Sequence, residues 1–165
     1  MVKKVTDEIE KIRIIKKEDP DINLLIMFDQ SSSVISTAVQ LELRHLRITQ
    51  PQVRILSMLS RENKPVTLDE LANWTFKEFN SVTTLINRME KRGLVKKIKK
   101  NEDSKTYIIP TEKGNFLYHN KIKEQSIHLI FGKLSDKEKK QLYNILKKLR
   151  DATSNFLGLD FKPPF

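Results

Sequence analysis

The sequence contains no cysteine, which excludes disulfide bonds, thiolate metal ligands and thiol-based redox sensing. Only four glycines occur in 165 residues, and they are widely separated: Gly93, Gly114, Gly132 and Gly158. No phosphate-cradling glycine loop and no nucleophile elbow can be built from such a distribution. The sequence therefore predicts that the chain is not an enzyme.

Histidine is also scarce, and tryptophan occurs once. His45, His119 and His128 show no metal-ligand spacing with carboxylates, so surface or packing roles are expected for them. Trp74 is expected to pack in a helix core rather than to form a stacking platform. We predict no metal and no cofactor.

Long apolar runs are missing as well. The longest purely apolar stretch runs from Leu24 to Phe28, which is far too short to span a bilayer. The N-terminal sequence MVKKVTDEIEK lacks the apolar centre of a secretory signal. Together with the absence of cysteine, these features predict a cytoplasmic protein with no membrane partner.

Positively charged residues outnumber negatively charged ones. The formal net charge is +10 and the sequence pI is about 9.7, which favours an anionic partner. Nucleic acid, an acidic protein and an anionic membrane surface all satisfy this condition. The length and apolar content are sufficient for one domain with a buried core.

The spacing of apolar residues, caps and breaks predicts a mainly α-helical chain with one small β-hairpin. Two capping boxes are expected, at Thr67 with Glu70 and at Ser135 with Glu138. The expected elements are a helix over 3–17 within an N-terminal extension (1–20), helices over 22–46, 51–62 and 68–74, a helix ending at Gly93, strands over 94–100 and 106–109, and helices from 111 to about 131 and from 135 to about 157.

The helix that ends at Gly93 has a polar face suited to DNA. Its apolar positions, Val82, Leu85, Ile86 and Met89, should face the core. The other faces carry short polar side chains and one arginine, which can reach base edges or phosphates; a solvated polar face is the alternative. The predicted DNA contacts of this helix are Asn80, Ser81, Thr83, Thr84, Asn87 and Arg88.

Lysines crowd the hairpin that follows. Alternating lysines often only protect an exposed strand edge from aggregation. Directly after a recognition-type helix, they favour contacts with phosphates, which can extend to the minor groove. The predicted contacts of this wing are Lys97, Lys99, Lys100, Ser104 and Lys105.

This order of elements resembles the MarR family of dimeric transcription regulators. The resemblance rests on the segments ITQPQVRIL, TLDELA, SVTTLINRMEKRGLV, the turn at Asp103 and TEKG, and it covers residues from about 22 to 157. It implies a MarR-type domain over 21–157, in which dimerisation helices from both chain ends flank a winged helix-turn-helix. The implied boundaries are about 48–111 for the winged helix-turn-helix, 67–92 for the helix-turn-helix, 21–46 and 111–157 for the dimerisation helices, and 158–165 for an apolar tail.

The resemblance also implies a function. It indicates a sequence-specific repressor that binds double-stranded DNA as a homodimer at a pseudo-palindromic operator and is released by a small-molecule effector. Family members hold such effectors between the dimerisation helices and the DNA-binding lobe. Phe28, Ser32, His45 and Arg47 could line that cleft here, with ordinary packing as the alternative for each.

The chain departs from the family pattern at the wing. Lys105 stands where the family usually has arginine, and lysine lacks the planar fork of a guanidinium group, which predicts looser selectivity at the wing tip. Pro110 shortens the expected second strand and leaves the hairpin register open. The segment TFKEFN lacks the common small-residue turn and leaves the start of the recognition helix open.

Two other functions fit the same residues. A non-specific architectural DNA-binding protein could use the same fold, and the lysine-rich wing favours it, whereas the polar helix favours a sequence-specific reader. A helical protein–protein adaptor could use the amphipathic chain ends and bind no DNA.

Overall fold

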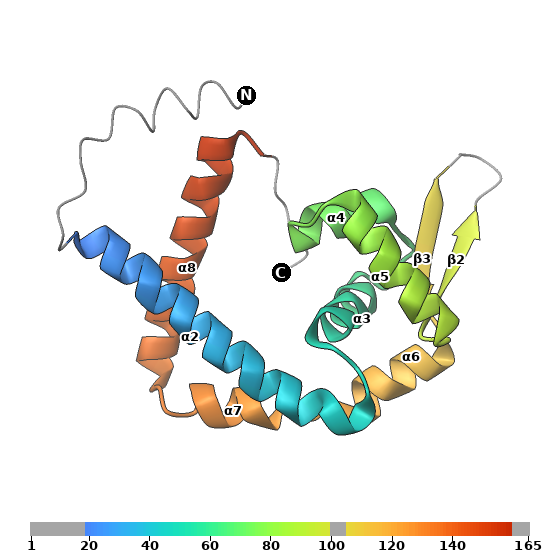
Figure 1. The fold of residues 1–165 in the computed structure, drawn as a ribbon, viewed down its shortest axis with the longest axis horizontal. Helices are drawn as coiled ribbons and strands as arrows, with labels where there is room; N and C mark the ends of the chain where they lie inside the picture. The colour runs from blue at the N-terminus through green and yellow to red at the C-terminus, as the bar shows by residue number, and fades with distance from the viewer. Residues whose placement is uncertain (1–18, 100–104, 160–165) are drawn as a thin grey trace. The chain divides into compact units, whose positions relative to one another are not determined.

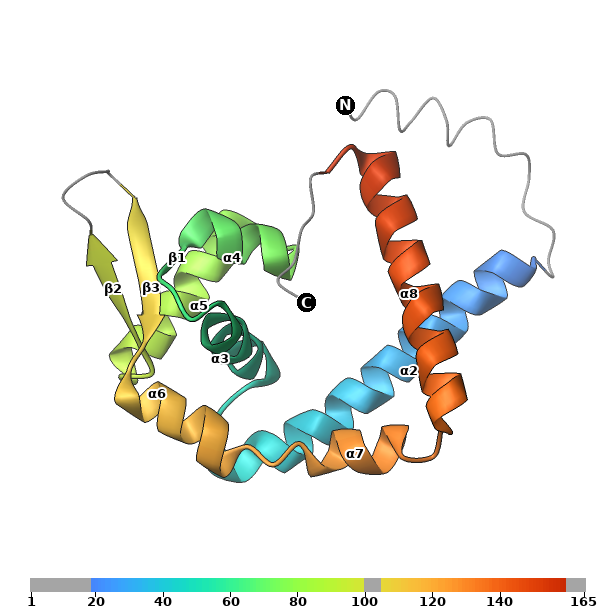
Figure 2. The same ribbon diagram turned by 180° about the vertical axis from the view of Figure 1, so that it is seen from behind.

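The structure is a computed structural model that describes residues 19–99 and 105–159 (Figures 1 and 2). The described residues form two compact units, one from 19–39 and 125–159 and the other from 40–99 and 105–124. The predicted N-terminal helix over 3–17, Lys100, Ser104 and most of the apolar tail lie outside the described residues.

The second unit is a winged helix-turn-helix with a three-stranded antiparallel sheet in the order β1-β3-β2. The predicted two strands are confirmed, and a third strand of two residues, β1, joins them by pairing with β3. The elements are η1 (Arg44–Leu46), α3 (Gln50–Glu62), β1 (Val66–Thr67), α4 (Leu68–Thr75), α5 (Phe79–Lys91), β2 (Val95–Lys99), β3 (Thr106–Pro110), α6 (Glu112–Phe116) and η2 (Leu117–Lys121).

The hairpin register is defined despite the proline. Val95 pairs with Pro110, Lys97 with Ile108 and Lys99 with Thr106. Pro110 is the last residue of β3, where the missing N–H donor costs least, so the strand runs one residue further than the sequence predicted.

The core of this unit lies between α3, α4, α5 and the sheet. Val82, Ile86 and Met89 of α5 are fully buried, as predicted, and they pack in one core with residues such as Ile55 of α3 and Ile108 of β3. Leu85, also predicted to face the core, is only half-buried. Trp74 is half-buried too, rather than fully enclosed.

The predicted helix boundaries hold where local chemistry defines them. The Glu70 carboxylate accepts hydrogen bonds from Thr67, and the Thr67 hydroxyl accepts one from the Glu70 N–H, which forms the predicted capping box. The second capping box forms at Ser135, whose hydrogen bonds lower the pKa of the Glu138 carboxyl. Gly93 adopts φ 67° beyond the end of α5, as expected for a left-handed stop.

The continuous helix predicted from 111 to about 131 is wrong, because it is broken into three pieces. After α6 the chain forms the π-helical turn η2, in which the Ile122 N–H donates to the Leu117 carbonyl. Ile122 is then extended and Glu124 is left-handed at φ 53°, so the α-helical ladder cannot continue. A new helix, α7 (Gln125–Phe131), begins in the other unit. The helix predicted over 22–46 likewise ends at Leu43, before η1.

The first unit consists of the N-terminal part of α2 (Pro20–Leu43), α7 and α8 (Asp136–Leu157). The Ser126 hydroxyl donates to the Ala38 carbonyl and links α7 to α2. Of the described residues in this unit, only Val39 and Ser154 are buried. Its large apolar side chains are largely exposed; they include Leu24, Leu25, Met27, Phe28, Val34, Leu129, Tyr143, Ile145, Leu149 and Phe156.

Among the described residues one helix, over Pro20–Leu46, is long and apolar enough to cross a membrane by length and composition alone. This helix is much longer than the apolar run from Leu24 to Phe28, because the small and hydroxylated residues in its middle extend it with little added charge. Core helices of soluble proteins pass the same test, so this is weak evidence for a span. Asp29 lies within the helix, and a carboxylate is costly inside a bilayer.

Candidate DNA-binding site

The turn that leads from α4 into helix α5 contains no glycine, although one of its residues is left-handed. α4 ends at Thr75, Phe76 takes the left-handed conformation at φ 56°, and α5 begins at Phe79 after an extended Glu78. This answers the question that TFKEFN left open about where α5 starts. Figures 1 and 2 both show α5 between α4 and the β2–β3 hairpin.

The outer face of α5 presents the predicted polar side chains. Thr83 is half-buried and its hydroxyl donates to the Phe79 carbonyl at 2.9 Å, so its donor is used within the helix. Thr84 and Arg88 are exposed, and neither side chain has a hydrogen bond or ion pair within 19–99 and 105–159. The remaining predicted contacts of α5 are also exposed: Asn80, Ser81 and Asn87.

The wing lysines differ from one another. Lys96, Lys99 and Lys105 are exposed. Lys97 is the exception, because its ammonium lies 3.1 Å from a Glu90 carboxylate oxygen and also donates to the Asn87 amide oxygen of α5. The hairpin therefore offers exposed cations beside the polar face of α5, and one lysine that is held against it.

A small depression beside α5 carries two cations that were not predicted as site residues. Its cavity volume is about 200 Å³. It is lined by Gln50, Pro51, Arg54, Thr75, Lys77 and Leu85. Arg54 and Lys77 are exposed, and Leu85 places the depression directly next to the recognition helix. Arg54 lies in the segment ITQPQVRIL, for which the sequence predicts only a helix of the fold. The apolar spacing of that helix gives no sign that Arg54 lies close to α5.

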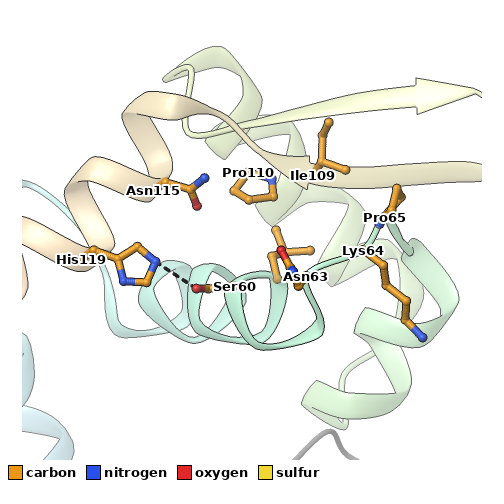
Figure 3. Close-up of a pocket in the computed structure, with 9 residues that line it drawn as sticks. Ser60, Asn63, Lys64, Pro65, Ile109, Pro110, Asn115 and His119 are labelled. Atoms are coloured by element: carbon orange, nitrogen blue, oxygen red, sulfur yellow. Dashed lines mark hydrogen bonds between the residues drawn. The ribbon is translucent and has the colours of Figure 1, made fainter.

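A larger groove of about 480 Å³ lies where α3, β3, α6 and η2 meet (Figure 3). Ser60 and Asn63 lie on one side of it and Pro110 and Asn115 on the other. The His119 Nε2 atom and the Ser60 hydroxyl are hydrogen-bonded at 3.0 Å at one end. The groove thus combines the apolar side chains of Leu59, Pro65, Ile109 and Pro110 with several polar hydrogen-bonding groups, which suits a small, partly apolar molecule.

The four residues predicted for an effector cleft are distributed over both units. Phe28 and Ser32 are exposed on α2 in the first unit. His45 and Arg47 are exposed in the second unit, where His45 Nδ1 donates to the Glu42 carbonyl at 2.7 Å. The effector cleft stays a prediction. The described part of the chain contains no cluster of three or more His, Asp or Glu side chains that could hold a metal.

The model of the MarR family matches residues 48–107, which is the segment from the start of the winged lobe into β3. Residues 48–107 therefore carry a MarR-family domain. The HTH-type transcriptional regulator FarR from Neisseria gonorrhoeae is 29% identical over 132 residues, covering 76% of this chain and 90% of FarR.

Solved MarR-type structures share the fold. The organohalide-sensing regulator RdhR, in its ligand-free form, has a TM-score of 0.77 at 23% identity, covering 93% of this chain and 96% of that one. MarR from E. coli, solved in complex with operator DNA, has a TM-score of 0.72 at 19% identity, with coverages of 80% and 99%. The predicted resemblance and fold class are therefore confirmed: residues 48–107 match the MarR family model, and the chain shares the winged-helix fold of the solved regulators.

Proposed function

We propose that this MarR-family regulator is a homodimeric repressor that binds a pseudo-palindromic duplex, with α5 in the major groove and the β2–β3 hairpin along the flanking backbone. The observation that supports this most is the exposed polar face of α5 next to the exposed cations Lys96, Lys99 and Lys105, within one compact unit. Base edges require polar side chains, and phosphates require cations. A protein that acts on DNA in this way is expected to be located in the cytoplasm.

Arg54 and Lys77 extend the proposed contact surface. Both cations line the depression that also includes Leu85 of α5. A backbone phosphate beside the major groove would be neutralised there, which adds affinity without sequence information.

The homodimer is proposed from the first unit. Its apolar side chains on α2, α7 and α8 are exposed, and an apolar surface of this extent normally marks an interface. A second copy of the chain is the simplest partner, since twofold symmetry also matches a pseudo-palindromic site.

The dimer can be tested by light scattering at low micromolar concentration. The wild-type chain should run as a dimer, and the double variant Ile145→Asp, Leu149→Asp should run as a monomer, because both side chains lie on one face of α8 and are more than half exposed. Lys147→Asp introduces the same side chain on the opposite face and should leave the dimer intact. A monomeric wild-type chain would contradict the proposal.

A small-molecule effector is the second part of the proposal. RdhR has also been solved with 2,4-dichlorophenol bound, with a TM-score of 0.75 to this chain at 24% identity. Here the groove at His119 and the predicted cleft at Arg47 are two candidate places for such a ligand. The groove is large enough for a molecule of this size and touches strand β3 of the wing.

Calorimetry with 2,4-dichlorophenol distinguishes the two places. We expect the wild-type chain to bind it, His119→Ala to weaken binding at least tenfold, and Arg47→Ala to leave it unchanged, because the groove supplies both apolar side chains and a hydrogen-bonding group at His119. The reverse pattern would place the ligand in the predicted cleft. A wild-type chain that binds no dichlorophenol would exclude this phenol as the effector.

Salt-dependent DNA binding separates the proposal from its two alternatives. A sequence-specific reader should prefer a selected duplex to a scrambled one by about 10³-fold or more at physiological salt. An architectural protein would bind both duplexes with similar affinity and a similar slope against salt. The adaptor would bind neither.

A further inference from the structure

Lys97 connects the wing to the recognition helix through three hydrogen bonds or ion contacts. Its ammonium lies 3.1 Å from Glu90 Oε2 and donates to Asn87 Oδ1. Its backbone N–H donates to Glu90 Oε1 at 3.2 Å. Glu90 and Asn87 lie one turn apart on α5, and Lys97 lies in the middle of β2, so one lysine fastens the strand to the helix.

This arrangement removes Lys97 from the set of free cations. Its side chain is 28% exposed, whereas the neighbouring Lys96 and Lys99 are exposed. A phosphate would have to compete with a carboxylate that already neutralises the ammonium at short range. Salt dependence arises from cations that release counterions from DNA, and a lysine paired within the protein contributes little to that release.

The same contact fixes the amide of Asn87. An ammonium group can only donate, so the oxygen of the amide faces Lys97 and the NH₂ group is left for other partners. Asparagine reads adenine by donating to N7 and accepting from the N6 amino group at the same time. An amide oxygen beside a cation is a poorer acceptor for a second donor, while its N–H groups become stronger donors.

We propose that Lys97 is a positioning residue for sequence reading: with Glu90 it holds Asn87 as a hydrogen-bond donor, so that α5 favours guanine, whose N7 and O6 both accept, over adenine, whose N6 amino group requires an acceptor beside N7. The inference rests on the proposed DNA-binding function and names a specificity determinant within it. In this proposal Lys97 positions Asn87, whereas Lys99 contacts a phosphate.

The test compares Lys97→Met with Lys99→Ala in the full chain, using a selected duplex and its scrambled counterpart over a range of salt concentrations. Lys97→Met keeps most of the apolar stem and removes the ammonium. It should leave the salt slope on scrambled DNA unchanged, reduce the ratio of selected to scrambled affinity about tenfold, and admit adenine at the position that Asn87 contacts. Lys97→Arg, which keeps a cation between Glu90 and Asn87, should restore the ratio.

Lys99→Ala is the matched control on the same strand. It should flatten the salt slope by roughly one to two units in a dimer, and weaken both duplexes by similar factors. The inference is overturned if Lys97→Met flattens the slope as Lys99→Ala does and leaves the affinity ratio intact, because Lys97 would then be a phosphate contact. Thermal unfolding of both variants checks that the lobe is folded. A wild-type chain that binds neither duplex would overturn the proposed function itself and this inference with it.

Discussion

Replacing Thr84 by glutamate is expected to lower the affinity for a selected duplex at least a hundredfold while leaving the helical circular-dichroism signal unchanged. Thr84 is exposed on the polar face of α5, and its hydroxyl makes no hydrogen bond within the described residues. A longer, negatively charged side chain there would meet base edges and phosphates at close range. A hundredfold loss is about 2.7 kcal/mol, within the range of one lost base contact plus charge repulsion.

Fluorescence anisotropy with a labelled duplex measures this loss. Asn120→Glu is the matched control, because Asn120 is exposed in the π-helical turn η2, away from both α5 and the hairpin. It makes the same change in charge and should alter affinity only about twofold through the general field of the protein. Thr84→Glu protein that retains full affinity would show that α5 is not the helix that reads DNA.

Gly114→Ala is expected to be the most destabilising small substitution in the chain. A Cβ atom at Gly114 would lie 2.0 Å from the Leu94 carbonyl oxygen and 3.3 Å from Leu56 Cδ2. The Leu94 oxygen cannot move away freely, since it accepts a hydrogen bond from the Thr111 N–H at 3.1 Å. Relief of this overlap requires moving α6 away from Leu94, which lies between α5 and β2, and we expect a loss of about 3 kcal/mol or more of the free energy of unfolding.

Thermal denaturation provides the readout, and Gly93→Ala is the control. At Gly93 the nearest atom to an added Cβ is Lys113 Cδ at 3.9 Å, so the cost is that of the left-handed backbone alone, about 1–2 kcal/mol. At about 4–8 °C per kcal/mol for a unit of this size, Gly114→Ala should lower Tm by clearly more than Gly93→Ala. Equal shifts for the two variants would contradict the close packing of α6 on Leu94.

The parts of the fold that local chemistry determines could be predicted from the sequence. Thr67 and Ser135 each precede a glutamate by three residues, and both form the capping boxes that this spacing predicts. Gly93 ends the recognition helix region because only glycine adopts φ 67° without strain. The MarR resemblance placed these pieces in the right order.

The sequence predictions of the fold failed where tertiary packing, rather than local sequence, determines the backbone conformation or the burial of a side chain. The sequence KIKEQS contains no proline or glycine, so nothing in it announces the left-handed Glu124 that separates η2 from α7. Strand β1 has two residues, which is too short for an alternating pattern. Leu85 follows the helical apolar spacing, yet it lines a surface depression instead of the core.

The residues of the candidate DNA-binding site could be predicted from the sequence, but the contacts among them could not. The polar face of α5 and the lysines of the hairpin follow from residue type and period. That Lys97 is held by Glu90 and Asn87 depends on the antiparallel register between β2 and β3 and on the distance between β2 and α5, which no sequence spacing expresses. Arg54 was likewise hidden, because its distance from α5 is set by packing.

Selection of bound duplexes from a random-sequence pool tests directly whether a dimer of this chain reads DNA with α5. We expect the wild-type chain to enrich an inverted repeat whose half-sites are about 10 bp apart, centre to centre, and the Thr84→Glu variant to enrich none. A pool that stays random, or an enriched sequence without twofold symmetry, would show that the chain does not read DNA as a symmetric dimer through α5.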